Sequence, residues 1–389
     1  MPILLSVSSL ASISAFSQDA GNRRDSPPPE IRHLSDSRNR AEAVREFKNR
    51  SETRRKAAIE KAKAKGFPIR GQRDGRFFEL SDLDEDGRPV YLTTLNKQAA
   101  ISSGASQIRN TGIYQLNGSG WTVGVWDGGS IRTTHQEFGA RVTSLDGASV
   151  SSHATHVAGT IGASGVTTNA QGMAPSVTID SYDWNSDLSE MAARAAASAN
   201  IAGSLVLSNH SYGYITGWDS NRYYGRYPDR EDERFGSYDS NAASIDALCV
   251  NAPYYLPFIA AGNDRTDTAP TSGATFEYYS GGNWVSKAYD PNTDPYDDGW
   301  DNGGFDTIEG YGVAKNVVTI GAVNDAVAGS TRVPANGTMT TFSSWGPTDD
   351  GRIKPDLVAN GYSLYSSDSG SNSQYSYKSG TSMATPSAM

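Results

Sequence analysis

From about Thr122 onward, short apolar segments of the sequence alternate with segments rich in alanine. Apolar runs with the length and composition of buried strands lie at residues 177–179, 205–207, 258–261 and 317–323. Two alanine-rich segments between them, 188–200 and 241–250, have the composition of helices. This alternation predicts an α/β fold with a doubly wound, mostly parallel sheet covered by helices on both faces. Such folds keep their active sites where the loops leave the carboxyl ends of the strands.

Residues 380–386 (GTSMATP) place a serine where a loop enters a helix. The backbone N–H groups of a helix's first turn have no partners within the helix, and together with the helix dipole they favour negative charge nearby. A serine at this point can attack a carbonyl carbon while its own N–H holds the oxyanion that forms. We therefore interpret Ser382 as a nucleophile, with an ordinary helix N-cap serine as the alternative.

A serine nucleophile needs a base, and the base needs a group that orients it. Residues 151–160 (SSHATHVAGT) supply two histidines, His153 and His156. Residues 123–129 (VGVWDGG) supply Asp127 at the end of a short apolar strand. The chain order of these groups is Asp, His, Ser, which is the order found in subtilisin.

Four further motifs lie between the histidine motif and the serine motif. They are 208–213 (SNHSYG), 259–263 (IAAGN), 342–347 (FSSWGP) and 351–356 (GRIKPD). With these motifs, residues 106–389 resemble the subtilisin-like serine peptidases, or subtilases. The resemblance implies a subtilisin-like fold and a secreted serine endopeptidase that hydrolyses peptide bonds through an acyl-enzyme.

The resemblance also assigns roles to individual residues. Ser382 attacks the scissile carbonyl, His153 transfers the proton, and Asp127 orients the imidazole. Asn263 supplies the second donor to the oxyanion through its side-chain amide. The position in the family motif selects His153 over His156 as the base. A pair of histidines three residues apart could instead hold a metal, but no third ligand with suitable spacing lies close in the sequence, so no catalytic metal is expected.

Substrate contacts are implied on two segments. Ser211, Tyr212 and Gly213 resemble the edge strand against which subtilases lay an extended substrate, using main-chain hydrogen bonds. Ala261 and Gly262 resemble a wall of the main specificity pocket, and their small size suggests room for a large apolar side chain. Polypeptides are therefore the expected substrates.

The N-terminal part of the chain divides into two predicted segments. Residues 3–16 are uncharged and mostly apolar or small, which indicates a signal peptide over residues 1–17 and a secreted or extracytoplasmic protein. Residues 18–105 then form a small α+β unit. It comprises a Pro-rich spacer at 26–29, a charged helix from about Ser37 to Lys65 with Ser37 as N-cap and Gly66 as stop, and a hairpin with strands at 77–80 and 90–92. By resemblance this unit is a propeptide, which acts as folding assistant and inhibitor of the catalytic domain at 106–389.

The distribution of charge supports a partnership between these two parts. Residues 21–75 carry 16 Lys and Arg against 8 Asp and Glu, whereas the remainder carries 18 against 35. A basic arm that binds nucleic acid is the alternative, but the segment lacks interleaved aromatic residues and the rest of the chain is acidic, so no nucleic acid is expected. No other apolar run approaches the ~18 residues of a membrane span.

Chemistry of this kind needs no cofactor, and a structural calcium ion is considered at two acidic segments. Residues 82–87 (DLDEDG) match half of an EF-hand loop, although Pro89 interrupts it and a hairpin turn explains it better. A long insertion between Asp264 and Lys315 contains six further aspartates, and both a calcium site and a solvated surface loop fit it. These aspartates are Asp290, Asp294, Asp297, Asp298, Asp301 and Asp306. The single cysteine, Cys249, is expected to be a buried core residue rather than a reactive thiol.

Two other hypotheses remain beside an active peptidase. In the subtilases the helix that Ser382 begins continues further, whereas this sequence ends at Met389. We therefore expect a catalytic domain that is incomplete at its C-terminus, with one sheet face partly uncovered, and an inactive fragment is the first alternative. The second is a non-catalytic binding module with the same fold, which the complete set of Asp127, His153, Ser382 and Asn263 argues against.

Overall fold

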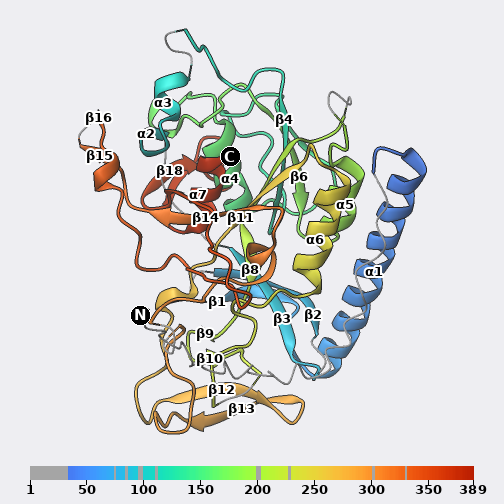
Figure 1. The fold of residues 1–389 in the computed structure, drawn as a ribbon, viewed down its shortest axis with the longest axis vertical. Coiled ribbons are helices and arrows are strands. Elements are labelled where there is room, and N and C mark those ends of the chain that lie inside the picture. Colours follow the sequence, from blue (N-terminus) through green and yellow to red (C-terminus); the bar gives the residue numbers. More distant parts are fainter. Residues whose placement is uncertain are drawn as a thin grey trace, which may run out of the picture.

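The computed structural model describes residues 34–389, apart from 74–75, 84–85, 95–99, 110–112, 199–202, 227–228, 300–302 and 329–330 (Figure 1). The predicted signal peptide at 1–17 and the Pro-rich spacer lie outside the described residues. Within the described ranges, no helix has both the length and the apolar character needed to cross a membrane.

A seven-stranded sheet, in the order β17-β14-β11-β7-β4-β6-β5, lies at the centre of the fold. Every neighbouring pair in it is parallel. Its strands are β4 (Thr122–Asp127), β5 (Val142–Ser144), β6 (Thr178–Asp183), β7 (Leu207–His210), β11 (Leu256–Ala260), β14 (Val318–Val323) and β17 (Leu357–Asn360). The predicted parallel sheet is therefore confirmed, with the strand ends shifted by a few residues from those expected.

Helices cover both faces of this sheet, as predicted. On one face α4 (Ser152–Gly162) and α7 (Thr381–Ala388) share an apolar cluster with Val125 of β4. On the other face α5 (Asp187–Arg194) and α6 (Ser240–Asn251) share a second cluster with Trp126. Adjacent residues of β4 enter opposite clusters because successive side chains of a strand point to opposite faces.

Helix α5 ends earlier than the sequence predicts. The expected helix runs to residue 200, but the chain leaves the helix at Ala195 and forms a bridge with Leu205. The N–H of Ala196 then donates to the Leu205 carbonyl at 3.0 Å. Pairing with the segment that leads into β7 thus overrides the helix propensity of the alanines.

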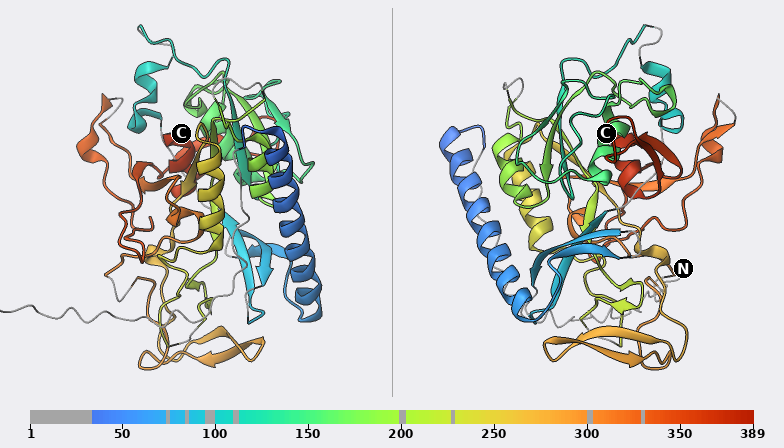
Figure 2. Two further views of the ribbon diagram at one scale, coloured as in Figure 1. Left: turned by 45° about the vertical axis from the view of Figure 1, so that its right-hand side comes forward. Right: turned by 180° about the vertical axis from the view of Figure 1, so that it is seen from behind.

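The N-terminal unit begins with α1 (Ser37–Ala64), which matches the predicted charged helix. Its N-cap is Asp36 and not Ser37, because the Asp36 carboxylate accepts hydrogen bonds from two N–H groups of the first turn at 2.8 and 3.2 Å. The helix stops before Gly66, whose φ of 72° suits glycine. Figures 1 and 2 show α1 lying outside α5 and α6.

A small antiparallel sheet completes the N-terminal unit. The predicted hairpin is present as β2 (Arg76–Leu83) and β3 (Pro89–Thr94), and an additional strand, β1 (Arg70–Arg73), pairs with β2. On its other edge, β3 pairs antiparallel with β8 (Tyr212–Tyr214), so that Thr93 lies opposite Gly213 and Thr94 opposite Tyr212. The N-terminal unit therefore occupies the strand that the sequence assigns to substrate binding.

The insertion between Asp264 and Lys315 contains regular structure, which corrects the interpretation as a solvated loop. Its strands β12 (Thr275–Ser280) and β13 (Asn283–Ala288) form an antiparallel hairpin. They extend a four-stranded sheet that also contains β9 (Trp218–Asp219) and β10 (Arg222–Tyr223). The hairpin is anchored because Phe276 packs with Trp218 and Tyr223 in a buried aromatic cluster.

The remaining elements are short. They are the helices α2 (Ala100–Ser103) and α3 (Ala105–Ile108), the pairs β15 (Val327–Ala328) with β16 (Thr331–Arg332) and β18 (Leu364–Ser367) with β19 (Tyr375–Lys378), and 3₁₀ turns at Thr168–Ala170, Asp264–Thr266, Gly310–Val313 and Pro334–Asn336. Beside the end of α7 lies a cavity of about 790 Å³. Its lining includes Leu207, Val358 and Met389, so this part of the sheet face is not fully covered by the described residues.

Candidate active site

Asp127 is the last residue of β4, and its side chain is fully buried. One carboxylate oxygen accepts a hydrogen bond from the N–H of Gly128 at 2.7 Å. The carboxylate oxygens lie 2.7 and 2.8 Å from Nδ1 of His153. The end of a central parallel strand thus places a buried carboxylate against one specific imidazole nitrogen.

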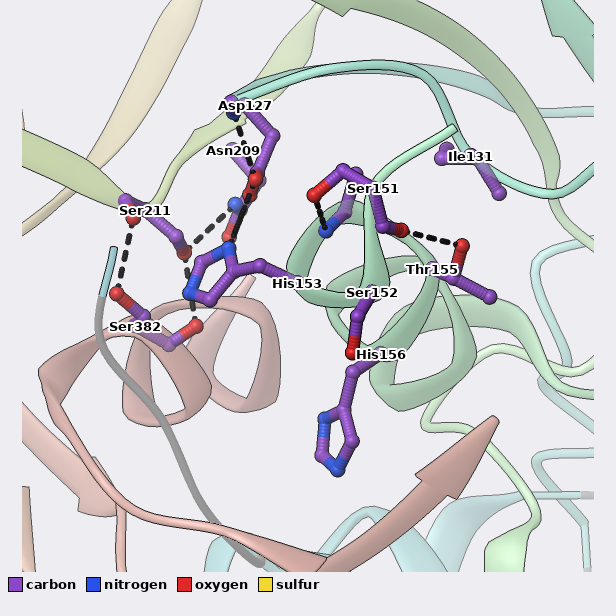
Figure 3. Close-up of polar contacts among 12 residues, drawn as sticks. Asp127, Ile131, Ser151, Ser152, His153, Thr155, His156, Asn209, Ser211 and Ser382 are labelled. Carbon is purple, nitrogen blue, oxygen red and sulfur yellow. Dashed lines mark hydrogen bonds and ion pairs between the residues drawn. The ribbon is translucent and has the colours of Figure 1, made fainter. Parts of the chain in front are cut away.

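His153 sits in the first turn of α4. Ser151 caps this helix, with its hydroxyl accepting from the N–H of Ala154 at 3.2 Å. Because Nδ1 donates to the Asp127 carboxylate, Nε2 of the neutral imidazole carries the lone pair. In Figure 3 the imidazole lies between Asp127 and Ser382. The sequence-predicted acid, base and serine are therefore brought together.

Ser382 is the second residue of α7, and Gly380 is the N-cap with φ of 149°. The Ser382 hydroxyl donates to the Ser211 carbonyl oxygen at 2.9 Å, and the Ser211 hydroxyl donates to the Ser382 carbonyl at 2.8 Å (Figure 3). Since a hydroxyl has a single hydrogen, proton transfer to His153 requires it to turn away from Ser211. Within the described ranges, the Ser382 N–H has no acceptor, as expected for the first turn of a helix.

Asn263 follows β11 at the same edge of the sheet. Its Oδ1 accepts from the Thr381 N–H at 2.9 Å and from the Thr381 hydroxyl at 3.2 Å. These bonds fix the side-chain amide with Nδ2 on the opposite side. Among the residues that the structure describes, Nδ2 has no acceptor, so two N–H groups, from Asn263 and Ser382, are available beside the serine.

The segment predicted to form a pocket wall reaches the same site. The Gly262 N–H donates to the Thr381 hydroxyl at 3.2 Å, and Ala261 is buried. Gly262 has φ of 100°, and a Cβ built there would lie 2.8 Å from a carboxylate oxygen of Asp264 and 2.9 Å from the Ser344 hydroxyl. Both its backbone conformation and its surroundings therefore require glycine.

The sequence did not indicate a role for Glu309, whose carboxylate binds the main chain of β8. One carboxylate oxygen accepts from the Tyr214 N–H at 2.9 Å, and a Cβ on Gly213 would lie 2.1 Å from the same oxygen. Burial raises the pKa of Glu309 well above its usual range, with Asp264 adding to the effect. No local pattern marks this residue, because it comes from the far end of the insertion.

His156 points away from the candidate site (Figure 3). Its Nε2 lies 3.1 Å from the Ser376 carbonyl and 3.3 Å from that of Leu364. Burial, followed by the charge of Lys378, lowers the pKa of His156 to about 3. His156 is thus a packed, hydrogen-bonded neighbour of His153, in agreement with the choice of His153 as the base.

The aspartates of the insertion mostly accept hydrogen bonds from the protein itself. Asp298 is buried and accepts from the Trp218 N–H, and buried Asp294 pairs with Lys287. Asp301 lies outside the described residues. In the part of the chain that the structure describes, no group of three or more acidic, histidine or cysteine side chains could hold a metal ion. Calcium binding stays a prediction.

Cys249 is buried, as expected from the sequence. It belongs to the apolar cluster beneath α5 and α6, and burial raises the pKa of its thiol to about 12. The thiol is therefore protonated at neutral pH and has the character of a core side chain.

Comparison of the sequence with known proteins identifies one family and two curated relatives. The sequence profile of the Subtilase family matches residues 118–388. The chain is 39% identical over 92 residues to serine protease AprX of Bacillus subtilis (strain 168), a match that covers 21% of this chain and 20% of AprX. It is 34% identical over 113 residues to the uncharacterized protein aq_aa18 of Aquifex aeolicus (strain VF5), covering 26% of this chain and 51% of that protein.

Among solved structures, a cold adapted subtilisin-like serine proteinase aligns with a TM-score of 0.39 and 23% identity, over 75% of this chain and 82% of that one. The match to AprX spans about a fifth of the length of that relative, and the match to aq_aa18 spans about half of the length of that protein.

Proposed function

Because the chain belongs to the subtilase family of serine peptidases, we propose that it is a serine endopeptidase whose catalytic residues are Asp127, His153 and Ser382. The observation that carries the proposal is the buried Asp127 carboxylate at 2.7 Å from Nδ1 of His153, on the side of the imidazole away from Ser382 (Figure 3). This contact selects the tautomer whose Nε2 can accept the serine proton. The catalytic domain is proposed to span residues 106–389.

In the proposed reaction, the Ser382 hydroxyl attacks the scissile carbonyl carbon while its proton passes to Nε2 of His153. Asp127 stabilises the imidazolium that forms. The imidazolium then gives its proton to the leaving amine, so the peptide C–N bond breaks and an acyl-enzyme remains. Water, deprotonated by the same imidazole, hydrolyses the ester and restores the Ser382 hydroxyl.

The negative charge on the attacked oxygen needs donors, and two suitable groups flank Ser382. The Ser382 N–H opens α7, and the Asn263 amide is oriented by its two bonds from Thr381. Both donors are fixed before the reaction, so they stabilise the developing charge without reorganisation. We propose them as the oxyanion hole.

Polypeptides are the proposed substrates, held as an added strand on β8. The N-terminal strand β3 already uses β8 in this way, with Thr93 opposite Gly213 and Thr94 opposite Tyr212. Ser211 directly precedes β8, and its carbonyl oxygen accepts the hydrogen bond from the Ser382 hydroxyl. Main-chain pairing of this kind depends little on sequence, so the neighbouring Ala261 and Gly262 wall would set the side-chain preference.

The same pairing supports a propeptide role for residues 18–105. A strand on β8 blocks substrate until it leaves, which makes this unit an inhibitor, and its packing on α5 makes it a folding assistant. The ladder runs toward Ser382, so we expect self-cleavage after it, between about residues 96 and 111. Secretion through the predicted signal peptide at 1–17 completes the proposal.

Labelling with a fluorophosphonate probe tests the proposed function. The chain, Ser382→Ala and the control Ser387→Ala, which removes another hydroxyl from α7, would be compared, and intact masses recorded. Labelling of the chain and of Ser387→Ala, but not of Ser382→Ala, supports the proposal. Loss of mass corresponding to cleavage between about residues 96 and 111 supports the propeptide.

Absence of both labelling and mass loss in a chain that unfolds cooperatively would contradict the peptidase and favour a binding module. Absence of labelling in a chain without cooperative unfolding would favour the inactive fragment.

A further inference from the structure

We propose that the β12–β13 hairpin is a docking element that recognises the N-terminal unit, separately from the substrate strand β8. This inference rests on the proposed function, because it takes residues 18–105 as a propeptide. The hairpin belongs to the insertion, and it contributes no residue to the candidate active site. Figures 1 and 2 show it beneath the N-terminal sheet, beside the C-terminal end of α1.

An apolar cluster joins the hairpin to the N-terminal unit. Buried side chains of both parts meet in it: Ala58, Ala62, Phe67 and Leu80 from the N-terminal unit, and Ile215, Tyr224 and Tyr279 from the rest of the chain. Trp284 of β13 packs against this cluster, with its ring 5.5 Å from that of Tyr279. The ring of Phe67, which is buried, lies 6.0 Å from that of Tyr279, so the N-terminal unit buries apolar surface against the hairpin.

Tyr279 adds a polar contact that is specific in direction. Its hydroxyl accepts a hydrogen bond from the Lys65 ammonium at 2.9 Å and donates to the Gly87 carbonyl at 2.5 Å. Lys65 also donates to the Gly282 carbonyl in the hairpin turn at 2.9 Å. One hydroxyl therefore links the end of α1 to the β2–β3 connection, and both partners belong to the N-terminal unit.

These contacts differ in kind from those on β8. The β3–β8 ladder uses main-chain groups, which any extended peptide can supply. The hairpin instead contacts a lysine at the end of a helix, a carbonyl in a turn and an apolar surface between them. Only a folded partner presents these groups together. The hairpin thus distinguishes this chain's own propeptide from ordinary substrates, and it holds the propeptide after the connecting segment is cut.

Dissociation of a nicked chain tests the docking role. The full chain carrying Ser382→Ala would receive a site-specific protease sequence in the segment 95–99, fold as one chain, and then be cut. Release of the N-terminal fragment would be followed by size-exclusion chromatography after dilution. Tyr279→Phe should release it about tenfold to hundredfold faster, because two hydrogen bonds are lost, one of them to a charged group.

Tyr278→Phe is the matched control, since Tyr278 is the neighbour of Tyr279 in β12 and its hydroxyl has no hydrogen-bond partner among the described residues. It should leave the release rate unchanged. Lys65→Met changes the other side of the contact without altering the hairpin, and it should also speed release. The double variant Tyr279→Phe/Lys65→Met should show less than the product of the two single effects, because both remove the same bond.

Equal release rates for the parent, Tyr279→Phe and Lys65→Met would overturn the proposal. The outcome is independent of catalysis, because every chain in this experiment lacks the Ser382 hydroxyl. Failure of the probe labelling together with fast release from Tyr279→Phe would leave docking intact and reject the peptidase. Normal probe labelling together with equal release rates would support the peptidase and reject the docking role of the hairpin.

Discussion

Acid should destabilise the fold through two buried histidines, His156 and His210. Both side chains are fully buried. His210 stacks on Trp126 with ring centroids 5.2 Å apart, and its two nitrogens bond to the hydroxyls of Ser208 and Tyr212. Burial lowers the pKa of His210 to about 3, as it does for His156. Both imidazoles are therefore neutral in the folded chain over the working pH range.

The direction and the size of this change in the free energy of unfolding follow from proton linkage. In the unfolded chain a histidine has a pKa of about 6.5, so it takes up a proton on acidification while the folded chain does not. The stability that each neutral imidazole contributes is complete above pH ~6.5 and is lost as the pH falls toward 3. At pH 5 the loss is about 2 kcal/mol for each histidine, or about 4 kcal/mol for the pair.

Urea unfolding of the full chain carrying Ser382→Ala, followed by circular dichroism at pH 7 and pH 5, measures this effect. Buried carboxyls act in the opposite direction, since burial raises the pKa of Asp187 to about 6 and that of Glu190 to about 8. The informative quantity is therefore a comparison between variants. His156→Gln should lower the acid-induced loss of stability by about 2 kcal/mol relative to the parent.

Thr160→Val provides the control for this comparison. Its hydroxyl donates to the His156 carbonyl on the preceding turn of α4 at 3.0 Å, so the variant perturbs the same region without removing a titratable group. The free energy of unfolding of Thr160→Val should depend on pH in the same way as that of the parent. The same dependence in His156→Gln and in the parent would refute the linkage, whatever the effect of the substitution at pH 7.

Asn263→Ala should lower kcat about 10²–10³-fold with little change in KM, which is the size of the effect at the equivalent asparagine of subtilisin; a change confined to KM in steady-state kinetics would argue against the oxyanion role. Gly159→Ala should lower the free energy of unfolding by about 1–3 kcal/mol, because the added Cβ would lie 2.2 Å from the Ser367 hydroxyl; unchanged urea unfolding would contradict this. Asp36→Ala should destabilise the start of α1 by removing its N-cap, and faster amide hydrogen exchange in that first turn is the expected sign.

The parts of the fold that the sequence predicts well are those encoded locally. Short apolar runs between alanine-rich segments indicate parallel strands, and Asp127 could be placed because it directly ends one of them. Ser382 could be placed because a small-residue loop leads into a helix. The sequence does not distinguish which of two adjacent residues caps α1, since Asp36 and Ser37 are both good N-caps and only the helix geometry separates them.

Other features depend on contacts between distant segments. Glu309 reaches β8 from across the insertion, and no local pattern predicts its bond to Tyr214. The β12–β13 hairpin, in contrast, does have a local signal. Gly281 and Gly282 have φ of 57° and 86°, which is the backbone of a two-residue hairpin turn that favours glycine at both positions. The aromatic residues of the two flanking strands agree with a hairpin, whereas the aspartates of the insertion indicate only a calcium site or a solvated loop.

The shortness of β8 has a consequence for solubility. Once a paired strand leaves, β8 becomes an exposed sheet edge, and long exposed edges promote aggregation between molecules. The strand, however, spans only Tyr212–Tyr214, and the Tyr214 N–H is directed to Glu309 and not to the edge that β3 occupies. An edge of this size can hold one peptide in register, but it offers too few free main-chain groups to nucleate a larger intermolecular sheet.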